Sequence, residues 1–190
     1  NIGSVSFFSL FFFKSGVVNK LCILGHELFF ILSSFFVAQN LNDRCIFAGG
    51  ILRGSRRERL LSKFVENECE KIDRLMELYM RYSDRVKAET ERMEQIQLDD
   101  FEMDEDEKYN RKLESGLYTL QLIAVILGHL WCSEHPQMRS RIELLLKQNR
   151  LGKNDIKDIL QEYHDNIGDL DGPEEKERAQ AKIQKFISAL

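Results

Sequence analysis

If the segment from Tyr109 to Cys132 formed a helix, it would carry apolar side chains on every side. A helix without a polar face must be covered on all sides, by protein or by lipid. Gln121, Gly128 and His129 interrupt the apolar run, which is shorter than the roughly 18–20 residues that span a membrane. We therefore predict that this segment is the central buried helix of a protein core.

The chain around this segment favours helices throughout. From Ser55 onward there is one proline before residue 170, and no run of β-branched residues alternates with a period of two. Capping signals predict that helices begin near Ser55, at Asn67 with a capping box to Glu70, at Pro136, near Asn154 and at Pro173. Short amphipathic helices in steady succession predict an all-α fold, an α-solenoid rather than a closed bundle.

The helix predicted to begin at Asn67 has one continuous apolar face. Its apolar residues follow helical spacing: Ile72, Leu75, Met76, Tyr79, Tyr82 and Val86. Beyond Val86 the sequence becomes polar, and two interpretations stay open there. The segment either projects as a solvated helix or forms a coiled coil, for which the apolar pattern alone is too brief.

An acidic block at residues 99–107 also has two interpretations. It is a solvated linker that supplies negative charge to the next helix N-terminus, or a docking strip for a basic peptide. We expect the block to stay extended or loosely ordered, because its charges repel. Its candidate partner-binding residues are Asp99, Asp100, Glu102, Asp104, Glu105, Asp106 and Glu107.

A basic cluster precedes the acidic block, at Arg53, Arg56, Arg57, Arg59 and Lys63. It is either a solvated helix face or a contact surface for phosphate or an acidic partner. The net charge is −4, and no aromatic side chains are interleaved to stack on bases. We therefore favour protein contact over direct contact with nucleic acid.

The sequence carries no recognisable catalytic motif. It has no glycine-rich phosphate loop, no Gly-x-Ser-x-Gly and no His-Glu-x-x-His. The four cysteines form no Cys-x-x-Cys pair, which is typical of a reducing compartment. His129, Cys132 and His135 have the tightest metal-like spacing but lack a fourth ligand nearby, so we expect a packed histidine and a buried thiol. We expect no enzyme, no metal and no cofactor.

Residues 1–48 differ in kind from the rest of the chain, because ten of the 13 phenylalanines lie within the first 47 residues. Three interpretations compete: a signal peptide or membrane anchor, a buried element of the following domain, or translated noncoding sequence. We favour the third, a hydrophobic Phe-rich leader from a retained intron or a misplaced exon boundary. We then expect residues 49–190 to be one incomplete helical domain. The alternative function is a membrane-tethered helical adaptor.

Five segments resemble the beta-catenin-like protein 1 family across residues 49–190: Leu60–Asn67, Glu70–Leu78, Leu117–Gln121, Pro136–Arg141 and Glu162–Asp169. The similarity is to the C-terminal end of the family protein. It implies the end of an armadillo/HEAT-like α-solenoid with a long helix and capping helices. It also implies a nuclear, spliceosome-associated scaffold of a Prp-nineteen-type complex.

The resemblance bears on partners as well. The family engages basic, nuclear-localisation-like peptides of splicing factors, and we expect splicing-complex components as protein partners. Because the family's peptide-binding repeats lie largely upstream, it assigns no peptide site to individual residues here. The piece would cap the solenoid and support partner contact or self-association.

Overall fold

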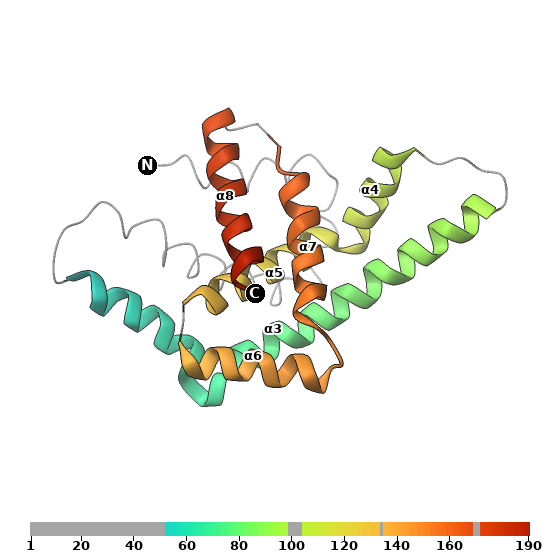
Figure 1. The fold of residues 1–190 in the computed structure, drawn as a ribbon. Coiled ribbons are helices and arrows are strands. Elements are labelled where there is room, and N and C mark those ends of the chain that lie inside the picture. The colour runs from blue at the N-terminus through green and yellow to red at the C-terminus, as the bar shows by residue number, and fades with distance from the viewer. Residues whose placement is uncertain (1–51, 99–103, 134, 169–171) are drawn as a thin grey trace, which may run out of the picture.

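The computed structural model describes residues 52–98, 104–133, 135–168 and 172–190. For residues 52–61 and 97–98 it describes the backbone only. These residues form six α-helices and no strand (Figure 1). The helices are α3 (Leu52–Leu98), α4 (Glu105–Ser115), α5 (Leu117–Cys132), α6 (Pro136–Gln148), α7 (Lys153–Asp165) and α8 (Pro173–Ala189). The predicted all-α fold class is confirmed. The predicted leader, residues 1–48, lies outside the described residues.

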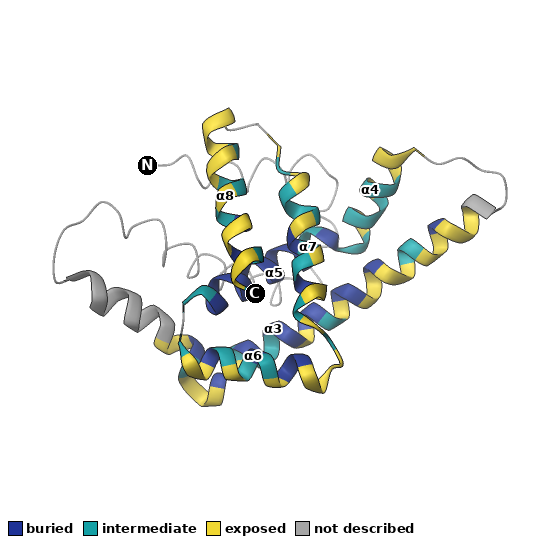
Figure 2. Cartoon of the chain, viewed as in Figure 1, coloured by how far each residue is buried: buried dark blue, intermediate teal, exposed yellow. Residues whose placement is uncertain are grey.

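Helix α5 forms the centre of the core, as predicted. Of its 16 residues, 13 are buried, and it contacts α3, α4, α6, α7 and α8 (Figure 2). Its apolar side chains therefore meet protein on every side. Among the described helices none is by itself long and apolar enough to cross a membrane. The bent pair of α4 and α5 meets that test by length and composition only.

The predicted extent of the central helix, Tyr109–Cys132, is wrong at its N-terminal end. Gly116 interrupts it with a φ of 115°, and α4 and α5 are bent by 71°. The ring of Tyr82 packs directly on Gly116, so that a Cβ there would lie 2.6 Å from Tyr82 Cδ1. Glycine is required because only a residue without a side chain allows both this φ and this contact.

Helix α3 bends sharply near residue 67, where the sequence predicts a new helix. Glu66 is extended (ψ 146°), and Asn67, Glu68 and Cys69 are left-handed, with φ of 52°, 56° and 69°. We call residues 66–69 the α3 elbow. The break is confirmed, but the predicted capping box is not formed, because the Asn67 side-chain amide donates to the Glu70 carboxylate at 3.1 Å. Ser55 is not an N-cap either, since α3 already begins at Leu52.

Beyond the elbow, α3 buries the predicted apolar face. All six residues from Ile72 to Val86 on this face are buried. The polar part that follows continues as a helix to Leu98 and packs against α4 (Figure 1). Met93 is buried in this part, while Ile96 is exposed. The segment is therefore a helix covered on one side by α4.

The last three helices complete the core around α5. Pro136 is the first residue of α6, and the predicted stripe is buried: Met138, Ile142, Leu145 and Leu146. Helix α7 is capped by Gly152 and not by the predicted Asn154, because the Asp155 carboxylate accepts a hydrogen bond from the Gly152 amide at 2.6 Å. Helix α8 opens with Glu174 and Glu175, as predicted, and packs on α5 and α7.

Candidate protein-interaction site

A cleft of about 450 Å³ lies between the C-terminal part of α3, helix α4 and the end of α7. We call it the α3–α4–α7 cleft. Three features of the helices place the residues that line the cleft. Helix α3 extends beyond the core, Gly116 bends α4 back toward it, and Asn166 ends α7 at the cleft mouth. Surfaces from three elements converge here, as in a recess for part of a partner.

The cleft is negatively charged. Four carboxylates line it, those of Glu94, Glu105, Asp106 and Glu162, together with the two ammonium groups of Lys108 and Lys112. The formal charge of the lining is therefore −2.

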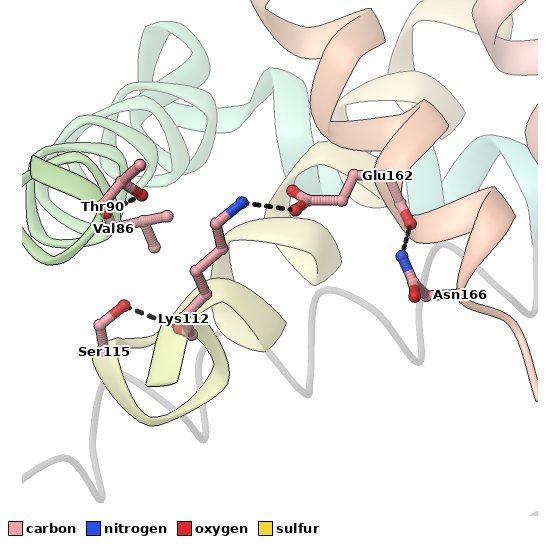
Figure 3. A network of polar contacts seen from close by, with 6 residues as sticks. All are labelled: Val86, Thr90, Lys112, Ser115, Glu162 and Asn166. Atoms are coloured by element: carbon pink, nitrogen blue, oxygen red, sulfur yellow. Dashed lines mark hydrogen bonds and ion pairs between the residues drawn. The ribbon is translucent and has the colours of Figure 1, made fainter. Parts of the chain in front are cut away.

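Two of the four carboxylates already have a cationic partner in the cleft. Lys108 pairs with Glu105 at 2.6 Å, and Lys112 pairs with Glu162 at 3.3 Å (Figure 3). The hydrogen bond and charge of Lys108 hold the pKa of Glu105 below its usual range. Glu94 and Asp106 form no ion pair with any described residue. Those two carboxylates are the ones that can accept a cation from outside.

The cleft is framed by local hydrogen bonds (Figure 3). The Thr90 hydroxyl donates to the Val86 carbonyl at 2.9 Å, and the Ser115 hydroxyl donates to the Lys112 carbonyl at 2.7 Å. On the opposite wall the Asn166 amide donates to the Glu162 carbonyl at 2.8 Å. The Thr90 bond lies within α3, whereas the Ser115 and Asn166 bonds lie at the C-terminal ends of α4 and α7. The Lys112–Glu162 pair joins α4 to α7 across the cleft.

The lining also has an apolar component. Met93 is buried and Tyr109 is half-buried, and both face the cleft. Burial raises the pKa of the Tyr109 hydroxyl, and likewise the pKa of Tyr163 in α7. Both hydroxyls therefore stay protonated at neutral pH. The cleft combines two carboxylates that have no ion pair with a described residue and the half-buried ring of Tyr109, which suits a segment that carries both basic and apolar side chains.

The predicted acidic block contributes two residues to the cleft, Glu105 and Asp106. Glu105, Asp106 and Glu107 form the first turn of α4, so this part is helical and not extended as predicted. The predicted charge at a helix N-terminus is confirmed. Glu107 pairs instead with Arg111 at 3.0 Å, and Asp104 precedes the helix without a side-chain cap bond. Asp99, Asp100 and Glu102 lie outside the described residues.

Sequence reasoning missed most of the cleft. Glu94, Lys112 and Glu162 belong to three different helices, and Lys112 and Glu162 are 50 positions apart. One residue indicated that this part of α3 contacts another element, namely Met93, which is apolar within a polar helical segment. No local pattern pointed to α7.

The predicted basic cluster lies apart from this cleft in sequence. Arg53, Arg56, Arg57 and Arg59 belong to the first part of α3, before the elbow, and their side chains are not among those described. Lys63 is exposed. Their role as a contact surface stays a prediction.

The metal-like spacing of His129, Cys132 and His135 spans the end of α5 and the start of α6. Among the described residues no group of three potential ligands is close enough to hold an ion. His129 is buried, with its ring 4.5 Å from that of Phe186, so the expected packed histidine is confirmed. Cys132 is only partly buried, in contrast to the predicted buried thiol.

Most of the chain resembles known proteins. A family model described as "Catenin-beta-like, Arm-motif containing nuclear" matches residues 46–161. Beta-catenin-like protein 1 of Bos taurus is 38% identical over 143 residues, which cover 72% of this chain and 25% of the relative. The Homo sapiens protein of that name is 37% identical, over 70% of this chain and 25% of its own length.

A more distant relative matches a shorter stretch of the chain. The beta-catenin-like protein 1 homolog of Schizosaccharomyces pombe is 30% identical over 115 residues, covering 58% of this chain and 20% of the relative. The chain thus spans about a quarter of the length of the curated relatives it matches. The Arm motif in the family description, together with the packed helices, confirms the predicted armadillo-like α-solenoid.

Proposed function

The chain belongs to the catenin-beta-like, Arm-motif containing nuclear family, and from this premise we propose that it is a non-enzymatic protein-interaction module that acts in the nucleus. The α3–α4–α7 cleft is the observation that carries the proposal. Its lining provides Glu94 and Asp106, two carboxylates that form no ion pair with a described residue, next to Met93 and the half-buried ring of Tyr109.

The partner is a protein segment with basic and apolar residues. Lysine or arginine side chains would pair with Glu94 and Asp106, and an apolar side chain would cover Tyr109. Each exposed ion pair contributes little by itself, so affinity depends on several contacts made together. Charge complementarity would mainly set specificity and the rate of association.

The biological setting is pre-mRNA splicing, in a complex of splicing proteins. The family resemblance supports this setting, and the nuclear description of the family agrees with it. In this account the chain supplies one contact surface, because it covers about a quarter of its relatives.

A pull-down from nuclear extract tests the proposal. The wild-type chain is compared with the double variant Glu94→Gln/Asp106→Asn, which removes both unpaired carboxylates. The matched control is Glu91→Gln/Glu114→Gln, because these two exposed residues also lie on α3 and α4 but outside the cleft.

The expected result is enrichment of splicing-complex proteins by the wild type and by the control, with loss in the cleft variant. Equal recovery by all three proteins would exclude the cleft as the contact surface. If none of them enriches splicing proteins over a scrambled chain, the splicing setting is wrong.

A further inference from the structure

The α3 elbow has a backbone conformation that its own sequence does not favour. Asn67, Glu68 and Cys69 are all left-handed, with φ between 52° and 69°. None of the four elbow residues is glycine or proline, and the residues on both sides are helical. Left-handed geometry costs free energy at each such residue, because Cβ crowds the following carbonyl oxygen. A run of three persists only where the surrounding structure holds it.

The contacts that hold the elbow lie on either side of it. Phe64, before the elbow, is 2% exposed, Ile72 is buried shortly after it, and Cys69, the last residue of the elbow, is buried as well. At the elbow itself, the bond between Asn67 and Glu70 is local and exposed, so it does not fix the direction of the chain.

Helix α6 supplies the polar contacts that hold α3 next to the elbow. The Arg141 guanidinium donates two hydrogen bonds to the Asp73 carboxylate, with distances of 2.6 Å and 2.5 Å. Asp73 lies one turn beyond the elbow, and α6 packs along α3 (Figure 1). A bidentate arginine–carboxylate pair of this kind fixes the relative orientation of the two side chains as well as their distance.

We infer that the α3 elbow is a strained joint that α6 holds bent through Arg141. When Arg141 leaves Asp73, residues 66–69 relax to a right-handed helix and α3 becomes continuous. The segment Leu52–Val65 then swings away from the core and uncovers the apolar surface around Phe64. The joint is a conformational device, which a partner that competes for Arg141 or Asp73 would release.

Distance measurement by double electron–electron resonance tests this inference on the full chain. Glu58 and Ala88 are each replaced by p-acetylphenylalanine and coupled to spin labels, so the native cysteines stay unchanged. An unbroken helix would separate these two positions by about 45 Å, at 1.5 Å per residue. The bent form gives a clearly shorter distance.

The expected result is a single short distance in the wild type and an added population near the straight-helix distance in Arg141→Ala. Asp73→Asn should give the same added population. Adding Glu68→Gly should suppress it, because glycine tolerates the left-handed conformation. An unchanged short distance in both single variants, with native helicity, would overturn the inference.

A stability measurement keeps the inference testable if Arg141→Ala fails to fold. Glu68→Gly alone should raise the midpoint of thermal unfolding by about 2–4 °C, because it removes strain from the bent state. The control Glu91→Gly places the same substitution in the right-handed part of α3 and should lower the midpoint. If Glu68→Gly also lowers it, the elbow is not strained and the inference fails.

Discussion

His129 illustrates how a titratable residue becomes part of a hydrophobic core. It is 5% exposed, and its Nε2 atom has no hydrogen-bond partner among the described residues. Burial, together with the smaller effect of the positive charge of Lys182, lowers its pKa to about 3. The folded protein therefore holds the imidazole neutral, whereas the unfolded chain protonates it near pH 6.5.

The first prediction concerns pH. The folded-state pKa of His129 is depressed, so its contribution to stability is complete above about pH 6.5 and is lost as the pH falls toward 3. Between pH 7 and pH 4.5, we expect wild type to lose about 2–3 kcal/mol more stability than His129→Leu. Urea unfolding at both pH values measures this difference. Parallel losses in the two proteins would contradict the placement of His129.

Gly116 is the residue where sequence analysis failed most clearly. Its φ of 115° and its contact with Tyr82 depend on a side chain 34 positions earlier in the sequence. No local pattern distinguished it from Gly128, which lies within α5 against Phe186. By contrast, the packing of His129 was predictable, because its neighbours on α5 are all apolar.

The second prediction compares two glycines. Gly116→Ala should destabilise the protein by about 2–3 kcal/mol, because the added Cβ meets the Tyr82 ring at a left-handed position. Gly168→Ala is the control, since a Cβ there meets nothing within 4 Å, and it should change stability by less than about 0.5 kcal/mol. Chemical denaturation of both variants and of wild type measures the changes in the free energy of unfolding. Similar small effects would mean that α4 does not bend at Gly116.

At the scale of the elements, a hydrogen bond from Trp131 and an apolar face hold helix α8 on α5. The Trp131 indole N–H donates to the Ala189 carbonyl at 2.7 Å, and Ile183 and Phe186 are buried. The apolar positions of α8 were predicted from helical spacing. The Trp131 bond was not, because it joins residues 58 positions apart.

The third prediction follows from that bond. Trp131→Phe keeps an aromatic ring but removes the indole donor, which should cost about 1–2 kcal/mol and loosen the end of α8. Hydrogen–deuterium exchange should show faster exchange in α8, with α3 unaffected. Unchanged protection of α8 would show that the indole bond does not hold it.

Helix starts were predictable where the signal is a proline and less so where it is a polar residue expected to cap the helix. Pro136 and Pro173 open α6 and α8 as expected, since proline fits the first turn of a helix. The start of α7 was misplaced, because Gly152 takes the place of a side-chain cap and Asp155 supplies the oxygen. A cap formed by a carboxylate three residues after the N-cap is hard to recognise in the sequence, because that residue looks like any other residue of the helix.

At the scale of the molecule, the all-α fold was predictable because apolar spacing and caps agree along the chain. The cleft was not, since it depends on how α3, α4 and α7 meet in space. The prediction of a Phe-rich leader at residues 1–48 stays a prediction. Continuous reads of mature transcript across codons 30–60 would contradict its origin in a retained intron or a misplaced exon boundary.

The fourth prediction tests the core as a whole. Leu120 is 1% exposed in α5, so Leu120→Asp buries a charge in the centre and should abolish cooperative unfolding and most of the helicity. Leu144→Asp is the matched control, because Leu144 is 44% exposed on α6 and should tolerate the charge. Circular dichroism during heating compares them. A native melting curve for Leu120→Asp would refute the central position of α5.

The central claim is that the α3–α4–α7 cleft binds a basic, partly apolar protein segment. Fluorescence anisotropy with a labelled peptide of lysine, arginine and leucine tests it most directly. The account predicts salt-dependent binding by wild type and by Glu91→Gln/Glu114→Gln, and affinity about tenfold weaker for Glu94→Gln/Asp106→Asn, equivalent to about 1.4 kcal/mol. Equal affinity of all three proteins, or equal binding of a peptide with glutamate in place of its basic residues, would contradict it.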